Sequence, residues 1–339
     1  MRWLALLLVA LTLFAGGAAW EAQRRLQAPL LVPEEGFVLT VAPGDSLRAV
    51  AGKLAHAGIL PYPRVALLYG RWSGADAQIN QGEYQLPADL TVESLLNLLQ
   101  SGRVIQYQVT LPEGITLARA LEIMAGSEVI EPELTGTRDP RIAGMIEPHE
   151  SAEGLFFPDS YRFTRGTRDW ELLQRARRRL SEVLSSEWEQ RRVGLPYETP
   201  YEALVMASII ERETGVPEER GEIAGVFVRR LQKGMRLQTD PTVIYGLGEN
   251  FDGNLTRRHL RDESNLYNTY RHSGLPPSPI ALPGRASINA ALHPAEGDAV
   301  YFVARGDGSH VFSATLAEHE AAVRKYQLKR RADYRSSPQ

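Results

Sequence analysis

Apolar and polar positions follow clear periods along most of the chain, but the first twenty residues do not. From Trp3 to Trp20, 18 residues pass without a charge, close to the roughly 20 that a helix needs to cross a bilayer. This run predicts a membrane anchor over residues 1–20, with Arg2 on the inner side. The alternative is a cleaved signal peptide that is cut after the small residues Gly17, Ala18 and Ala19.

The segment after the anchor is polar and then becomes periodic. Residues 21–36 carry charges and scattered prolines and are predicted to form a stalk. Strand, helix, helix and strand are then expected in that order, at residues 37–41, 46–57, 62–69 and 82–86. With Pro43, Gly44, Asp45, Ser46 and Leu47 at the first turn, this order resembles a LysM peptidoglycan-binding module over residues 37–110. The connection over residues 69–84 is longer than in that module, so a plain α/β spacer is the alternative.

Helical periodicity dominates the remainder of the chain. Helices are expected at residues 116–125, 170–192, 200–214 and 316–325, with another ending near 233, and a hairpin at 300–312. The mixture predicts an α+β fold, with one large domain over residues 111–330 and a polar tail over 331–339.

Composition excludes several classes of function. The net charge is −3, so no global basic surface for nucleic acid is present. The chain has no cysteine, and His293, His310 and His319 lack the spacing of zinc ligands. Ser208 lacks the Gly-x-Ser-x-Gly turn of a serine hydrolase. We therefore expect neither a metal nor a cofactor.

Helix 200–214 has strong end signals and carries two carboxylates. Thr199 and Glu202 have the spacing of a capping box, and Gly215 is the expected stop. Glu211 lies near the C-terminal end, where the helix dipole and apolar neighbours favour the protonated carboxyl. Such a group suits protonation of a glycosidic oxygen. Glu213 lies about 200° further round the helix, so the two side chains should diverge. The alternative role for Glu211 is an ordinary ion pair.

Two further segments offer groups for binding a sugar. Gln238, Thr239 and Asp240 precede Pro241 and are expected to form a bent polar loop, although such a loop often caps its own backbone. Asn268 lies between two tyrosines in the run Tyr-Asn-Thr-Tyr, which places an amide between aromatic faces. That arrangement suits an acetamido sugar.

Taken together, these runs resemble the endolytic murein transglycosylases of the YceG-like (MltG) type. The resemblance is strongest from 207 to 319. It rests on Ala-Ser-Ile-Ile-Glu-Arg-Glu-Thr at 207–214, Arg-Leu-Gln-Thr-Asp-Pro-Thr-Val-Ile-Tyr-Gly at 236–246, Tyr-Asn-Thr-Tyr at 267–270, Gly-Leu-Pro-Pro at 274–277, and His-Val-Phe at 310–312 before Glu-His at 318–319.

The resemblance implies a single-pass inner-membrane protein with its catalytic part in the periplasm. It implies cleavage of the bond between N-acetylmuramic acid and N-acetylglucosamine, which leaves 1,6-anhydromuramic ends. The implied role is to end the growth of new glycan strands, and the implied partners are peptidoglycan synthases. Glu211 is then the expected catalytic acid, with Glu213 as its rival. The expected substrate-positioning residues are Gln238, Thr239, Asp240, Tyr245 and Asn268. The alternatives are a non-catalytic wall-binding scaffold and a water-using glycoside hydrolase.

Overall fold

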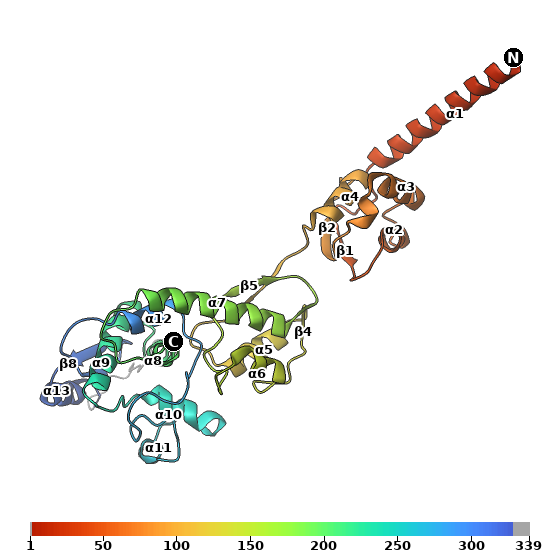
Figure 1. Ribbon diagram of the computed structural model, residues 1–339. Helices are drawn as coiled ribbons and strands as arrows, with labels where there is room; N and C mark the ends of the chain where they lie inside the picture. The colour runs from red at the N-terminus through yellow and green to blue at the C-terminus, as the bar shows by residue number, and fades with distance from the viewer. Residues whose placement is uncertain (1, 328–339) are drawn as a thin grey trace. The chain divides into compact units, whose positions relative to one another are not determined.

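The structure, a computed structural model, describes residues 2–327, which form two compact units (Figure 1). Unit 1 runs to residue 107 and includes residues 162–166, and unit 2 holds the other described residues. Both contain helices and short two-stranded sheets, which confirms the mixed α+β class. The expected tail at 331–339 lies outside the described residues.

Helix α1 (Arg2–Gln27) is the one described helix that is long and apolar enough to cross a membrane. Its apolar window, Leu6–Gln27, is not buried against the remainder of the protein. A single-pass anchor is therefore compatible with the structure. The stalk expected at 21–36 is not what is observed, because α1 continues through its first half and Leu30 and Val32 are then buried in the core of unit 1.

Unit 1 shows the order of elements that its periodicity predicted. Its elements after α1 are β1 (Phe37–Val41), α2 (Leu47–His56), α3 (Pro63–Ser73), a 3₁₀ turn (Ala75–Ala77), β2 (Gly82–Leu86) and α4 (Val92–Ser101). Strands β1 and β2 pair antiparallel, with Phe37 opposite Leu86. Ser46 caps α2 and Thr91 caps α4 through their side-chain oxygens, which satisfies helical N–H groups that have no partner within the helix.

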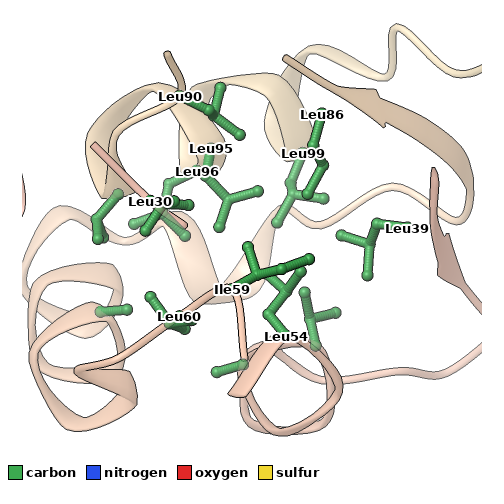
Figure 2. Close-up of a cluster of buried hydrophobic side chains, with 14 of the residues drawn as sticks. Leu30, Leu39, Leu54, Ile59, Leu60, Leu86, Leu90, Leu95, Leu96 and Leu99 are labelled. Carbon is green, nitrogen blue, oxygen red and sulfur yellow. The ribbon is translucent and has the colours of Figure 1, made fainter. Parts of the chain in front are cut away.

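The core of unit 1 is a cluster of buried side chains between the sheet and the helices, most of them leucines, together with valines, alanines, Ile59 and Tyr84 (Figure 2). Leu54 of α2 and Leu99 of α4 are both fully buried. Each such side chain contributes roughly 1.5–3 kcal/mol by leaving water. Gly70 of α3 lies against Leu47, and any side chain at that position would clash with it. The close approach fixes which face of α3 points inward.

Unit 2 is built mainly of helices. Its elements are β3 (Tyr107–Thr110), α5 (Leu117–Ala125), β4 (Ile130–Glu131), α6 (Pro140–Ile146), β5 (Ser160–Phe163), β6 (Thr167–Arg168), α7 (Asp169–Glu189), α8 (Pro200–Glu213), η2 (Pro217–Glu219), α9 (Arg220–Gln232), α10 (Asp240–Leu247), η3 (Gly248–Asn250), α11 (Arg257–Arg261), α12 (Arg285–Leu292), β7 (Tyr301–Ala304), β8 (His310–Ser313) and α13 (Leu316–Tyr326). The first residue of β3 and the last two of β5 belong to unit 1. Strands β3 and β5 pair, β4 and β6 pair parallel, and β7 and β8 form the expected hairpin.

Helix α8 is the central helix of unit 2. Every residue from Ala203 to Ile210 is buried, and α12, α9, α7 and α10 all pack against it. A helix that is buried on all sides is apolar all round, and α8 matches this from Ala203 to Ile210 apart from Ser208, whose hydroxyl donates to the carbonyl oxygen of Val205. Thr199 caps it, while Glu202 accepts from the backbone N–H of Glu198 and so misses the reciprocal bond of a capping box. The helix ends at Glu213, two residues before the expected stop at Gly215.

The segment expected as a bent polar loop at 238–240 is partly helical. Asp240 begins α10, and Pro241 occupies its first turn, a position where proline is well tolerated because its missing N–H has no helical partner. Helix α12 follows a proline-rich segment and was also not expected. Both helices have only eight residues, too few for a clear periodic signal.

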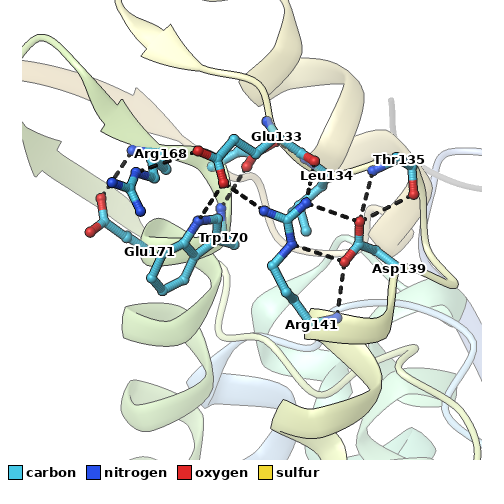
Figure 3. Close-up of polar contacts among 9 residues, drawn as sticks. Glu133, Leu134, Thr135, Asp139, Arg141, Arg168, Trp170 and Glu171 are labelled. Atoms are coloured by element: carbon cyan, nitrogen blue, oxygen red, sulfur yellow. Dashed lines mark hydrogen bonds and ion pairs between the residues drawn. The ribbon is translucent and has the colours of Figure 1, made fainter.

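A polar cluster fixes the loop before α6 to the start of α7 (Figure 3). Arg141 pairs with both Asp139 and Glu133, and the indole N–H of Trp170 donates to Glu133 at 3.1 Å. Hydrogen bonds from Arg141 hold the pKa of Asp139 well below its usual range. The cluster thereby holds this loop in place. Arg138, which belongs to the loop, lines one of the cavities described below.

Candidate functional site

The end of α8 opens into a cavity of about 580 Å³ in unit 2, named here the Glu213 cavity. Its lining comes from the last turn of α8, the start of α10, the β7–β8 hairpin and α13. The polar and aromatic residues that line it include Arg212, Glu213, Arg230, Gln238, Asp240, Tyr270, Tyr301, His310 and His319. Segments far apart in sequence therefore meet around one carboxyl group.

Glu213 is the last residue of α8 and has the environment of a protonated acid. The pKa of its carboxyl is raised to about 7, chiefly by burial and also by the neighbouring Asp240, while a hydrogen bond from Thr239 and the charge of Arg230 oppose the rise. The Thr239 hydroxyl donates to Oε2 of Glu213 at 2.5 Å, which holds the carboxyl in one orientation. A carboxyl with this pKa both gives and accepts a proton near neutral pH.

Asp240 and Gln238 lie beside Glu213 in the same cavity. The Tyr270 hydroxyl donates to Oδ1 of Asp240 at 2.6 Å. Gln238 has a φ of 51° and is the one non-glycine residue with positive φ among the described residues. Strained backbone of this kind clusters at functional sites, where the surrounding structure holds it in place.

Arg230 forms a fixed cationic wall of the Glu213 cavity. Its buried guanidinium donates to the carbonyl oxygens of Val300 at 2.6 Å and Leu237 at 2.7 Å and lies 5.3 Å from the centre of the Tyr301 ring. These contacts leave it little freedom to move. It can therefore attract an anionic group of a substrate without reorganising.

Glu211 points elsewhere, as its position on the helix predicted. Its Oε2 accepts from the backbone N–H of Gly284 at 2.9 Å, and Oε1 lies 3.6 Å from Arg220. The side chain is nearly buried and lines neither of the two cavities described here. These contacts give Glu211 the surroundings of a structural ion pair.

The predicted positioning residues differ in their access to a ligand. Gln238 and Asp240 line the Glu213 cavity, whereas Thr239 is buried and does not line it. Asn268 is fully buried, and its amide nitrogen donates to the carbonyl oxygens of His259 and Asp262. The structure therefore places Asn268 as a brace for its own loop and not at a cavity wall.

Tyr245 lines a second cavity of about 950 Å³, named here the Tyr245 cavity. Its ring meets that of Tyr267 edge to face at 4.8 Å. Arg212, Pro241 and Ile244 line both this cavity and the Glu213 cavity, so the two are neighbours on either side of these residues.

Glu153 is a buried carboxyl in the Tyr245 cavity that sequence reasoning missed. It accepts from the N–H of Leu117 at 2.9 Å and from the Tyr245 hydroxyl at 3.4 Å. Burial raises the pKa of Glu153 to about 7, although these bonds oppose the rise. The available signal was a glutamate directly before the apolar run Gly-Leu-Phe-Phe-Pro at 154–158.

Among residues 2–327, no group of three histidine or acidic side chains is placed to hold a metal ion. His310 lines the Glu213 cavity, and its Nδ1 lies 2.7 Å from Glu219. That a reaction here needs no metal stays a prediction.

Comparison with known proteins matches residues 39–325 to the YceG-like family. The endolytic murein transglycosylase of Bacillus subtilis (strain 168) is 30% identical over 311 residues, which cover 85% of this chain and 84% of that protein. The endolytic murein transglycosylase of Streptococcus pneumoniae (strain D39) is 25% identical over 355 residues, 94% of this chain and 64% of that protein.

The fold has a counterpart among solved structures. A YceG-like protein from Listeria monocytogenes is 25% identical, with a TM-score of 0.52 over 85% of this chain and 99% of that one. The family match covers most of both units. The chain therefore belongs to the YceG-like family.

Proposed function

We propose that this protein is a lytic transglycosylase that cleaves the glycan strands of peptidoglycan at internal positions. Two similar proteins are named endolytic murein transglycosylases. The observation that carries the proposal in this chain is Glu213, an oriented carboxyl with a pKa of about 7 in a cavity beside Gln238, Asp240 and Arg230.

The reaction follows from one carboxyl that acts twice. Protonated Glu213 donates to the oxygen that links N-acetylmuramic acid to the next N-acetylglucosamine, and the bond from that oxygen to the muramic C1 breaks. The Glu213 carboxylate then takes the proton from the C6 hydroxyl of the same muramic acid. O6 bonds to C1 and closes a 1,6-anhydro ring, which restores protonated Glu213. The nucleophile is internal to the substrate, so no activated water is required.

The sequence interpretation placed this acid at Glu211. We favour Glu213, because Glu213 lines a cavity and is oriented by Thr239, whereas Glu211 is engaged by Arg220 and the N–H of Gly284. A general acid must come within hydrogen-bond reach of the substrate oxygen. The position of Glu213 in a cavity wall supports its assignment as the acid.

A water-using glycoside hydrolase is the second candidate, and Asp240 favours it. Asp240 shares the cavity with Glu213, and a second carboxylate can activate a water molecule. Digestion of peptidoglycan by the purified protein, followed by mass spectrometry of the products, distinguishes the candidates. Anhydro ends support the transglycosylase, and reducing ends support the hydrolase. If the purified protein does not cleave peptidoglycan, the result supports a non-catalytic wall-binding scaffold.

We further propose that the Tyr245 cavity binds sugar units that flank the scissile bond. It offers two tyrosine rings and a buried carboxyl beside the Glu213 cavity. Tyr245→Phe removes a hydroxyl from the cavity wall, and the loss of its hydrogen bond to a bound sugar costs about 1–2 kcal/mol, or roughly 5–30-fold in binding. The KM for polymeric glycan should rise by that factor while kcat changes little. Tyr161→Phe serves as the control, because its hydroxyl donates to the carbonyl oxygen of Phe157 and Tyr161 lines neither cavity. An unchanged KM in Tyr245→Phe would contradict the proposal.

For unit 1 we propose that the LysM-like segment binds glycan. The support is the order strand, helix, helix, strand with antiparallel β1 and β2. Hydrogen exchange of the full chain with and without glycan oligomers tests this. Slower exchange within residues 37–86 is expected, and unchanged exchange there would make the segment a spacer.

The location and the partners are also proposals. We propose that α1 stays in the inner membrane, that both units lie in the periplasm, and that peptidoglycan synthases work beside the enzyme. Protease added outside spheroplasts should digest the units and spare α1. Cross-linking in cells should recover a synthase, and recovery of none would remove that partner.

A further inference from the structure

Helix α3 of unit 1 has two opposite faces of different character. Ala66 and Gly70 are buried, and Gly70 lies against Leu47 of α2. Leu68 and Trp72 lie two residues further along, about 200° around the helix, and they are 69% and 82% exposed. The inner face is therefore fixed by packing, and a leucine and a tryptophan are left in solvent on the outer face.

The charges on the outer face of α3 have a single sign. Arg64 and Arg71 are exposed, and the helix sequence Pro-Arg-Val-Ala-Leu-Leu-Tyr-Gly-Arg-Trp-Ser holds no acidic residue. Neither arginine forms an ion pair among the described residues. A helix with tryptophan and leucine beside unpaired arginines has the composition of helices that lie in the lipid headgroup region.

The position of α3 points to the same partner. Figure 1 shows α3 beside the C-terminal end of α1, and the two helices are in contact. The guanidinium of Arg25 in α1 lies 4.4 Å from the centre of the Tyr62 ring, directly before α3. Arg25 lies five residues beyond Trp20, where the charge-free run ends, which is about 7.5 Å along the helix. The first turn of α3 therefore lies at the level where α1 would leave a bilayer.

We propose that α3 is a membrane-surface helix, which inserts Leu68 and Trp72 into the headgroup region while Arg64 and Arg71 bind lipid phosphates. Tryptophan is favoured at this depth because its ring is amphipathic, and arginine pairs well with phosphate. Unit 1 is then held against the bilayer by α1 and α3 together. The inference rests on α1 being a retained membrane anchor.

The absence of cysteine from the chain allows a direct test with single-cysteine variants of the full-length protein. Leu68→Cys and Trp72→Cys carry an environment-sensitive fluorophore in liposomes that contain phosphatidylglycerol. Val38→Cys on β1 is the matched control, because Val38 is an apolar residue that is 46% exposed and β1 lies at the end of unit 1 away from α1 (Figure 1). Phe14→Cys within α1 reports on the anchor.

Lipids with a quencher near the headgroup should quench the labels at 68 and 72 at least roughly twofold more than the label at 38, and lipids with a quencher in the acyl chain should quench the label at 14. Strong quenching at 14 with none at 68 and 72 would overturn the proposal and leave the anchor standing. If the label at residue 14 is not quenched, α1 is not a membrane anchor, and the proposal that α3 lies on the membrane surface is rejected as well. Neither outcome bears on the proposal of glycan cleavage, which is tested separately by mass spectrometry of the products.

Discussion

Glu213→Gln is expected to abolish cleavage of peptidoglycan while the protein stays folded. The substitution keeps the shape of the side chain and its hydrogen bond from Thr239 but removes the transferable proton. General acid–base catalysis contributes about 10²–10⁴-fold, and here one group serves both proton transfers, so the loss should reach the upper part of that range. The rate of release of soluble muropeptides measures it.

Glu211→Gln is the matched control, because it makes the same chemical change two residues earlier in α8. It removes the ion pair with Arg220, which keeps the charge of Glu113 nearby, so the free energy of unfolding should fall by about 1–3 kcal/mol. Cleavage by the folded fraction should stay within a few-fold of wild type. If Glu211→Gln loses cleavage while Glu213→Gln keeps it, the catalytic acid is Glu211 and not Glu213.

The cleavage rate is expected to fall about tenfold per pH unit above pH 7, because the first step needs protonated Glu213. Burial raises the pKa of this carboxyl to about 7, so the protonated fraction is nearly complete at pH 5 and falls as the pH rises through 7. The dependence of kcat/KM on pH reports this ionisation in the free enzyme.

Glu153 also has a pKa raised to about 7, so the fall of the cleavage rate above pH 7 needs a control that separates the two carboxyls. Glu153→Gln cannot ionise and should keep the same alkaline limb if Glu213 is the acid. Asp240→Asn removes a neighbouring negative charge that raises the pKa of Glu213, so it should move the limb to lower pH. A limb that vanishes in Glu153→Gln would assign the titration to Glu153.

Local elements of this protein were predictable because neighbouring residues determine them. Ser46, Thr91, Thr116 and Thr199 each cap the helix that follows, since a cap needs only an oxygen beside the first N–H groups. Helix α2 buries Leu47, Val50, Ala51 and Leu54, which share one face at helical spacing. The divergence of Glu211 and Glu213 also follows from helical geometry alone. The short helices α10 and α12 were missed, because eight residues hold barely two turns.

The candidate site was only partly predictable. Gln238 and Asp240 were expected near a carboxyl of α8, and both line the Glu213 cavity. Asn268 was expected to face a sugar, but it is fully buried and braces its own loop. Sequence pattern gives the chemical groups of a side chain, whereas its partners depend on segments that are distant in sequence.

The sequence by itself determined that α8 ends in two carboxylates on different faces, that a long apolar helix precedes both units, and that the chain resembles the YceG-like family. Only the tertiary structure decided which carboxyl lines a cavity. The reason is physical, because the environment of a carboxyl depends on the dielectric and the charges around it. Arg220 and Gly284 surround Glu211, and Thr239 and Asp240 surround Glu213. These neighbours reach α8 only when the chain has folded.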